Sequence, residues 1–478
     1  MKLFLTATIS VIASMGAAAI AQDPSASSSE VGSDLIQSDA EALRADAAIY
    51  SEMYGVNQNE AERRIKLMVS AQEIANLEEQ EAGEDLVSSY FEHDGEFRLV
   101  IEKRGQGQTR RVTRNVGVRG RPSERLEMPV EYRSSNRPTR VTLRKIFRER
   151  NNMIDRTFPE PHVVSYDERE GVLTLSFDNG VALENAARRQ ARLENAIGVT
   201  VRLLQGSPET ETGMRGGLQP YRLNEGGGSY ITNCTLGFAA QGPGPAYREG
   251  YITAGHCADN LYWKESDTAQ PIALTSIDRQ TSRGDWQFTW GAPVERLFKA
   301  DTGTFRRATG RRTLSTTCEK TGSSSVSDSA ILVTPDNSYC DGATNGTFVC
   351  WFPGHYGKTI SGIHGLHTVG HTAVGQQCGE VNAKAVKLQE CGPTDNLVCD
   401  YAWVEVIPKS GQSTFVAWQG DSGSPIFAWN TAFGIMTNSG YYGSYGQQYR
   451  VDDATGRTTH MWYTPIDEIY REGYSLLY

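Results

Sequence analysis

The cysteines of this chain are confined to its second half, and this feature constrains the fold more than any other. The chain has 478 residues and 8 cysteines, of which the first is Cys234. An even number of cysteines in one region indicates a disulfide-bonded domain in an oxidising compartment. The sequence therefore predicts two parts, a cysteine-free first part and a second part held by disulfides.

The first residues predict export. Lys2 precedes a largely apolar run from Leu3 to Ile20, which ends in the small-residue motif Ala19-Ile20-Ala21. This pattern is typical of a signal peptide over residues 1–21, cleaved after Ala21. A membrane anchor is the alternative, but the run is short and rich in small residues. We expect a secreted protein, extracellular or periplasmic, with no membrane attachment after signal removal.

The charge of the chain bears on its partners. A formal net charge of -10 argues against nucleic-acid binding, because phosphate contacts need a basic face. Residues 103–150 are nevertheless rich in arginine. This segment is either a polyanion-binding arm or the solvated face of a folded domain beside an acidic partner. Its interleaved glycine, proline and valine favour the folded face.

The part before the cysteines has an α+β pattern after a polar start that we expect to be disordered. Helical spacing begins at Asp39, and Asn57 with Glu60 makes a capping-box-like start. Further on, residues 172–177, 181–197 and 199–204 predict a strand, a helix and a strand, which together form a β-α-β unit. The Gly-rich residues 206–229 form the natural linker to the second part.

Two short motifs in the second part predict nucleophilic catalysis. Ser422 lies between glycines in Gly420-Asp421-Ser422-Gly423-Ser424-Pro425, a turn that can expose its hydroxyl. A serine nucleophile needs an imidazole to take its proton, and His256 lies upstream in Thr253-Ala254-Gly255-His256-Cys257. We therefore predict Ser422 as the nucleophile and His256 as the general base and acid.

These motifs and four others occur in an order that resembles a known family. The others are Met214-Arg215-Gly216-Gly217, Asn233-Cys234-Thr235-Leu236-Gly237-Phe238, Gly284-Asp285-Trp286 and Val374-Gly375-Gln376-Gln377-Cys378-Gly379. From about Met214 to Tyr478 the chain resembles secreted chymotrypsin-like serine proteases of the streptogrisin and α-lytic protease branch. The resemblance implies an all-β fold of two six-stranded antiparallel β-barrels with the active site between them. Pro465-Ile466-Asp467-Glu468 would open a C-terminal helix.

The resemblance also implies a role for the first part. Members of this branch are made with a pro-region that assists folding and then inhibits the enzyme, and Tyr54-Gly55-Val56 with Glu60-Ala61-Glu62-Arg63-Arg64 is similar to such pro-regions. Residues 22–213 would then be an α+β pro-domain. Self-cleavage would fall between Gly213 and Met214, and residues 214–478 would be the protease domain.

Further roles follow from the resemblance. Asp285, 29 residues after His256, would orient the imidazole, with Asp278 and Asp400 as alternatives. The backbone N–H groups of Gly420 and Ser422 would form the oxyanion hole, in which each donor contributes roughly 3 kcal/mol. Cys234 would pair with Cys257. The other cysteines allow 15 pairings and are Cys318, Cys340, Cys350, Cys378, Cys391 and Cys399.

Substrate preference and departures from the family can be partly predicted. Val416 stands six residues before Ser422, where trypsin-like enzymes have an acid, so we expect a preference for apolar side chains. A strand edge that binds the substrate backbone would comprise Thr437, Asn438 and Ser439. Ser424 replaces the usual glycine, and its small size should preserve activity. The 137 residues from Asp285 to Ser422 indicate a long insertion around 318–367, and Asp421 needs a compensating group.

Other readings are weaker. His364, His367 and His371 could hold a structural zinc ion, but their Gly-rich setting favours a polar loop. An α/β-hydrolase is disfavoured because Ser424 breaks its Gly-x-Ser-x-Gly motif, and a catalytically inactive binding protein on a protease fold remains the alternative. We predict a monomeric serine endopeptidase without cofactor or metal. It would cleave protein or peptide substrates through an acyl-enzyme on Ser422, and its own pro-region would inhibit it.

Overall fold

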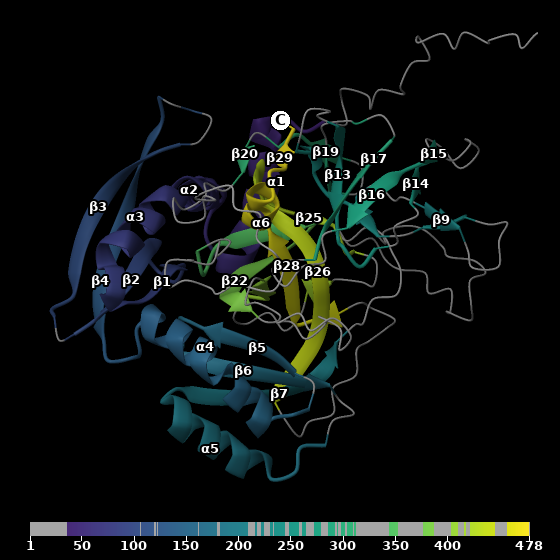
Figure 1. Ribbon diagram of the computed structural model, residues 1–478. Coiled ribbons are helices and arrows are strands. Elements are labelled where there is room, and N and C mark those ends of the chain that lie inside the picture. The colour runs from purple at the N-terminus through teal and green to yellow at the C-terminus, as the bar shows by residue number, and fades with distance from the viewer. Residues whose placement is uncertain are drawn as a thin grey trace, which may run out of the picture.

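The structure is a computed structural model that describes most of residues 36–208 and shorter segments beyond them. The described residues are 36–105, 107–118, 121, 123–160, 162–178, 182–208, 216–217, 221–223, 230–232, 234–243, 248–257, 261–263, 272–278, 285–291, 294, 298–301, 304–308, 310–311, 344–351, 376–386, 403–409, 415–416, 421–444 and 457–477. We call residues 36–208 the N-terminal region and the later residues the C-terminal region. Figure 1 shows both.

The N-terminal region begins with helices α1 (Asp39–Tyr54), α2 (Gln58–Ser70) and α3 (Gln72–Ala82), followed by a short 3-10 turn, η2 (Gly83–Asp85). Asn57 caps α2, since its side chain accepts a 3.0 Å hydrogen bond from the Glu60 N–H, as the sequence predicts. The helices lie beside a sheet of order β1-β2-β4-β3. Its strands are β1 (Leu86–Glu92), β2 (Arg98–Arg104), β3 (Arg110–Gly117) and β4 (Arg125–Ser135).

A smaller α/β unit completes the N-terminal region. It contains α4 (Arg140–Thr157), β5 (His162–Asp167), β6 (Val172–Asp178), α5 (Ala186–Ile197) and β7 (Thr200–Pro208). Strands β6 and β7 pair in parallel with α5 as their crossover, which confirms the predicted β-α-β unit. Buried leucines such as Leu173, Leu175 and Leu193 pack the helices against the strands.

The C-terminal region is mainly β and contains a closed barrel of six strands. In barrel order the strands are β21 (Phe348–Trp351), β25 (Pro425–Ala428), β26 (Thr431–Ser444), β28 (His460–Pro465), β23 (Trp403–Ile407) and β22 (Gln377–Val386), and β22 pairs back to β21. Every pairing around this ring is antiparallel. This confirms the all-β architecture and one of the two expected barrels.

The described residues do not close a second barrel. They form a sheet of order β16-β17-β13-β12-β29 and another of order β10-β9-β14-β15. The first contains β12 (Ala239–Gln241), β13 (Glu249–Thr253), β16 (Thr275–Asp278), β17 (Gln287–Trp290) and β29 (Ser475–Leu476), and the second contains β9 (Tyr221–Leu223), β10 (Tyr230–Thr232), β14 (Tyr262–Trp263) and β15 (Ile272–Ala273). The remaining short strands are β8 (Gly216–Gly217), β11 (Thr235–Leu236), β18 (Phe298–Asp301), β19 (Thr304–Arg306), β20 (Gly310–Arg311), β24 (Phe415–Val416) and β27 (Arg457–Thr458).

Two features of this region bear on the sequence predictions. Helix α6 (Ile466–Arg471) follows Pro465 and is the expected C-terminal helix. Strand β21 falls inside the range 318–367 that was expected to be an insertion, so part of that range belongs to the barrel. Apart from residues 344–351, that range lies outside the described residues.

The N-terminal region extends the barrel sheet. Strand β7 pairs antiparallel with the end of β26, from Pro208↔Gly440 to Leu204↔Ser444, and β5 bridges to β22 (Figure 1). Val163 and Leu204 of the N-terminal region pack against the buried Trp403 and Trp462 of the barrel. The two regions are thus joined by strand pairing and by an apolar contact.

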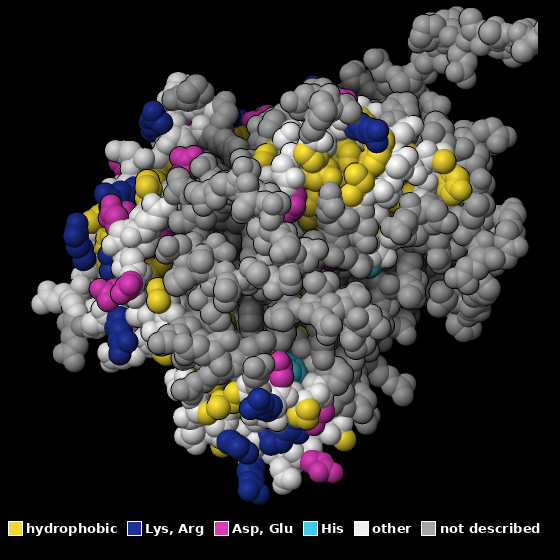
Figure 2. All heavy atoms as spheres, viewed as in Figure 1, with side chains coloured by type: hydrophobic (Ala, Val, Ile, Leu, Met, Phe, Trp, Pro, Cys, Tyr) yellow, Lys and Arg dark blue, Asp and Glu magenta, His cyan; other side chains and the backbone are white. Residues whose placement is uncertain are grey.

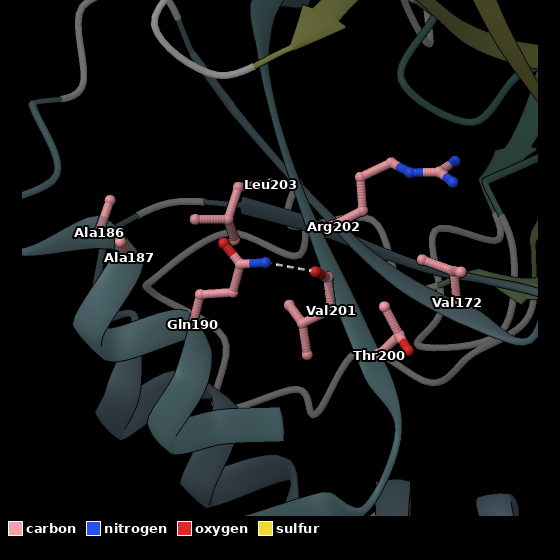
Figure 3. Close-up of a pocket in the computed structure, with 8 residues that line it drawn as sticks. All are labelled: Val172, Ala186, Ala187, Gln190, Thr200, Val201, Arg202 and Leu203. Carbon is pink, nitrogen blue, oxygen red and sulfur yellow. Dashed lines mark hydrogen bonds between the residues drawn. The ribbon is translucent and has the colours of Figure 1, made fainter. Parts of the chain in front are cut away.

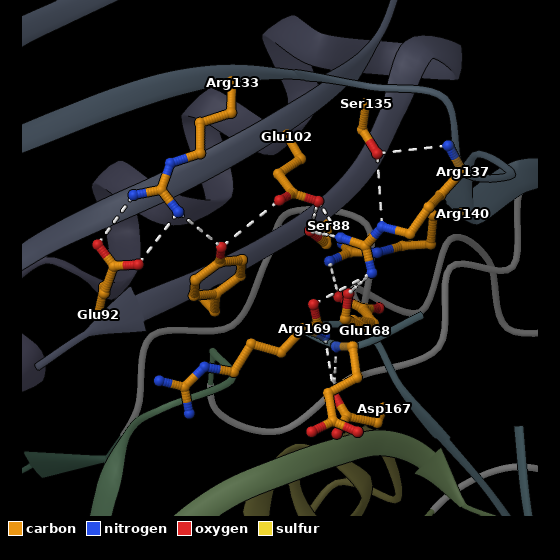
Figure 4. Close-up of polar contacts among 12 residues, drawn as sticks. Ser88, Glu92, Glu102, Arg133, Ser135, Arg137, Arg140, Asp167, Glu168 and Arg169 are labelled. Atoms are coloured by element: carbon orange, nitrogen blue, oxygen red, sulfur yellow. Dashed lines mark hydrogen bonds and ion pairs between the residues drawn. The ribbon is translucent and has the colours of Figure 1, made fainter. Parts of the chain in front are cut away.

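Most of the arginine-rich segment belongs to the first sheet, in β3 and β4, and its last residues begin α4. On the left of Figure 2, where this sheet lies, Lys and Arg side chains are interspersed with Asp and Glu side chains. Arg114 pairs with Glu78 at 2.6 Å, and Arg133 pairs with Glu92 at 2.9 Å. Figure 4 shows the Arg133 pair and the nearby buried Arg140, which reaches Glu168 at 2.6 Å. These pairs within one region favour the folded face over a polyanion-binding arm.

Among the described helices, none has the length and apolar character that a membrane-crossing segment needs.

Candidate active site

The structure brings together the three residues predicted as a catalytic triad. The Ser422 Oγ lies 2.9 Å from His256 Nε2. On the other side of the ring, His256 Nδ1 bonds to Asp285 Oδ2, and the His256 backbone N–H donates to Asp285 Oδ1 at 2.8 Å. Asp285 thus holds both the imidazole and the backbone of His256. Asp278 instead pairs with Gln287 between β16 and β17, and Asp400 lies outside the described residues.

Local structure fixes the position of His256. It lies three residues after the end of β13, and the neighbouring Cys257 forms a disulfide with Cys234, as the resemblance implied. The Thr253 hydroxyl donates to the Thr235 carbonyl, which ties β13 to the segment after Cys234. The imidazole side chain keeps 21% of its surface exposed, so the histidine lies at the rim of the site.

The Ser422 turn is pressed against that same segment. Gly423 has φ +89°, which disfavours residues with a Cβ, and a Cβ there would overlap the Thr235 carbonyl. The Thr235 N–H donates to the Ser422 carbonyl at 2.8 Å. Ser424 is fully buried, its N–H donates to the Asp421 carbonyl at 2.8 Å, and its Oγ lies 3.5 Å from the Thr235 hydroxyl oxygen, so the turn accommodates a serine. Asp421 is also fully buried.

Thr464 of β28 supports Asp285 and was not predicted from the sequence. Its hydroxyl oxygen lies 3.2 Å from the Asp285 N–H and 3.3 Å from the Asp285 carbonyl. The Thr437 hydroxyl contacts the Thr464 hydroxyl oxygen at 3.0 Å. A threonine on an apolar strand carries no motif, so only the register of β28 against β26 could have revealed this role.

Hydrogen-bond chemistry determines what this arrangement can do. If His256 donates from Nδ1 to the Asp285 carboxylate, its Nε2 can accept the Ser422 proton. The single hydroxyl proton has a second acceptor, the Thr437 carbonyl at 3.2 Å, but Nε2 is closer. The geometry is that of a serine made nucleophilic by an adjacent base that a carboxylate orients.

The predicted substrate-binding residues lie on one strand. Thr437, Asn438 and Ser439 belong to β26, beside β28. On the opposite edge of β26, β25 pairs up to Ile435 and β7 pairs from Gly440 onward. In the part of the sheet that the structure describes, no strand occupies that edge from 437 to 439. A substrate backbone could therefore add there, next to Ser422.

Other predicted residues fall in different places. Val416 belongs to β24, which pairs with β27. Gly420, Ala21, Gly213 and Met214 lie outside the described residues, as do His364, His367 and His371. Cys350 and Cys378 form the second disulfide, between facing residues of β21 and β22. The other four cysteines, Cys318, Cys340, Cys391 and Cys399, are not among the described residues.

Among the described residues, one group of potential metal ligands includes His256. The potential ligand atoms of Cys234, His256 and Cys257 lie within 4.8 Å of one another, but both sulfur atoms are in the disulfide and cannot bind a metal as thiolates.

A hollow of about 560 Å³ lies between α5 and β7, where Gln190 donates to the Val201 carbonyl at 2.7 Å (Figure 3). None of the residues that line it belongs to the predicted site.

Comparisons with known proteins add little at the level of sequence. No family model matches the chain, and no curated protein matches it. Among 30 matching solved chains is the crystal structure of Cellulomonas bogoriensis chymotrypsin. It is 16% identical to this chain, with a TM-score of 0.29, and the match covers 55% of this chain and 97% of that one.

Proposed function

We propose that this protein is a serine endopeptidase that hydrolyses peptide bonds through an acyl-enzyme on Ser422. The observation that carries the proposal is the hydrogen-bonded series from Ser422 Oγ to His256 Nε2 and from His256 Nδ1 to Asp285. His256 takes the serine proton as the hydroxyl attacks the carbonyl carbon and returns it to the leaving amine. Water then hydrolyses the acyl-enzyme by the same route. The backbone N–H groups of Gly420 and Ser422 would bind the oxyanion, and the substrate side chain would be apolar.

The protein would be made as a secreted, self-processing zymogen. Ser422 is fully buried in the uncut chain, which fits a blocked site. Strand β7 runs antiparallel to β26 and ends at Pro208, opposite Gly440. At this end β7 points along β26 towards Thr437, whose carbonyl contacts the Ser422 hydroxyl. Residues 22–213 would then inhibit the protease until a cut near Gly213 and Met214.

A fluorophosphonate probe tests this proposal, because it reacts only with an activated serine. The secreted protein would be labelled and analysed by mass spectrometry, with Ser422→Ala as the control. We expect the label on Ser422 and a mature N-terminus near Met214. Absence of label on a correctly processed chain would favour the alternative, an inactive binding protein on a protease fold. Absence of label on an uncleaved chain would call for cutting the linker with an added protease before labelling again.

A further inference from the structure

Helix α1 inserts a buried carboxylate into the C-terminal region. Asp46 has no exposed surface, and neither does Arg306, whose Nη1 lies 2.7 Å from Asp46 Oδ1. Gln376 Nε2 donates to the same oxygen at 2.7 Å, and the Trp429 N–H donates to Asp46 Oδ2 at 2.6 Å. Three donors from three separate segments of the C-terminal region thus converge on one side chain of the N-terminal region.

The C-terminal region holds these donors in place without help from Asp46. Arg306 Nη1 donates to the Trp429 carbonyl at 3.2 Å, and its Nη2 donates to Gln376 Oε1 at 3.1 Å. The guanidinium also lies over the ring of Phe427, 5.0 Å from its centre. The donors are therefore pre-organised for a carboxylate, which lowers the cost of binding one.

The start of α1 strengthens the same contact. Trp429 and Asn430 form the turn between β25 and β26. The Trp429 indole N–H donates to the Asp39 carbonyl at 2.8 Å, and the Asn430 amide donates to the Asp39 side chain. Gln37 accepts from Arg306 Nε at 2.7 Å. The first turn of α1 and the residues before it thus lie against this turn of the barrel.

Charge gives this contact its importance. A guanidinium taken out of water needs a paired anion, and losing one member of a buried pair is strongly destabilising. Among the described residues, Asp46 is the carboxylate within ion-pair distance of Arg306. Removal of α1 would leave Arg306 with neutral partners alone.

We propose that Arg306, Gln376 and the Trp429 N–H form a carboxylate-binding site, with Asp46 on α1 as its ligand, that latches the N-terminal region to the barrel. The latch shares no residue with the triad and acts in addition to the pairing of β7 with β26. It keeps the N-terminal region bound after the chain between Pro208 and Gly216 is cut. It rests on the proposed function only in that such a cut occurs during maturation.

The test uses the full chain with Ser422→Ala and a recognition sequence for an added endoprotease inserted between Pro208 and Gly216. After cutting, the dissociation rate of the N-terminal fragment is measured by gel filtration of diluted samples over time. Asp46→Asn keeps the shape of the side chain but removes its charge, and we expect dissociation to accelerate on the order of a hundredfold. The matched control is Glu52→Gln, an exposed acid of the same helix, which should leave the rate within about threefold.

A double substitution separates the charge pair from general damage. Asp46→Leu with Arg306→Met replaces both charges by apolar groups, so dissociation should return to within about tenfold of the unaltered chain. Equal dissociation rates for Asp46→Asn and the unaltered chain would overturn the proposal.

A measurement without substitution covers the case in which Asp46→Asn does not fold. In the cut but otherwise unaltered chain, the Trp429 amide should stay protected from hydrogen exchange. Rapid exchange there while the fragment remains bound would also overturn the proposal. The test needs no catalysis, because an added protease makes the cut. A serine that never reacts with fluorophosphonate would therefore count against the proposed function and leave this result unaffected.

Discussion

Thr464 illustrates, at the residue scale, how the site depends on a group outside its motifs. One hydroxyl oxygen contacts both backbone polar groups of Asp285 and also the Thr437 hydroxyl. All three residues are buried, so no water can easily replace a lost hydroxyl. We therefore treat Thr464 as a positioning residue that acts on the triad through Asp285.

Replacing Thr464 tests this role. Thr464→Val removes the hydroxyl at nearly constant volume and leaves the Asp285 N–H buried without its acceptor, at a cost of about 1–3 kcal/mol. We expect kcat against a peptide substrate to fall roughly tenfold with little change in KM, because the triad loses alignment in the transition state. Thr464→Ser should restore kcat. If Thr464 had only a structural role, the Val variant would have a lower melting temperature, but kcat of its folded fraction would be unchanged.

Residues in short motifs were predictable and residues in long-range contacts were not. Ser422 and His256 could be identified because nucleophile and base each lie in a local turn with a typical sequence, and the structure places His256 between Ser422 and Asp285. Asp46 looks like any other acid of an amphipathic helix. Its importance arises from Arg306, which lies 260 positions further along the chain.

At the scale of elements, the closing seam of the barrel lies between β21 and β22. Strand β21 has only four residues, Phe348–Trp351, and its partner β22 is longer. Cys350 and Cys378 face each other across this seam and are joined by a disulfide. Strand β21 was not predictable from the sequence, because it is short and fully buried, so it lacks the alternation of a half-exposed strand.

The seam disulfide should contribute to stability more than to catalysis. It closes a loop with a sequence separation of 28, for which the chain-entropy model gives about 3–4 kcal/mol. We expect Cys350→Ala with Cys378→Ala to lower the free energy of unfolding by that amount and to leave kcat nearly unchanged. Urea denaturation followed by tryptophan fluorescence measures the first effect.

The other disulfide provides the comparison. Cys234→Ala with Cys257→Ala loosens the segment that carries His256, so this variant should also lose activity in its folded fraction. Equal kcat losses for the two double variants would show that neither bridge has a separate role at the site.

At the scale of the whole molecule, a buried histidine joins the two regions. His93 of the N-terminal region bonds to the Gly346 carbonyl of the C-terminal region at 2.6 Å, and its other ring nitrogen bonds to the Tyr50 hydroxyl. Burial lowers the pKa of His93 to about 4, although Glu380 and the bond to Gly346 act in the opposite direction, and Arg169 and Arg64 add to the lowering. The folded chain therefore holds His93 neutral at pH 7.

This depressed pKa predicts acid sensitivity. The unfolded chain protonates His93 below about pH 6.5, whereas the folded chain does so only near pH 4, so stability is complete above pH 6.5 and is lost as the pH falls towards 4. Between pH 7 and 4.5 this group should account for roughly 2–3 kcal/mol of the loss. Urea unfolding of the chain with Ser422→Ala measures this loss of free energy of unfolding. The same chain with His93→Gln should lose less free energy of unfolding over the same pH range. Identical losses in both chains would exclude His93 as the cause.

The pairing of β7 with β26 also bears on how the barrel behaves in concentrated solution. Without β7, residues Gly440 to Ser444 present an unpaired strand edge, and Trp403 and Trp462 lose the cover of Val163 and Leu204. An open edge beside a bare aromatic surface is what neighbouring molecules need to associate strand to strand. We therefore expect the N-terminal region to keep the protein soluble, and its removal in the proposed maturation to leave a barrel that aggregates more readily.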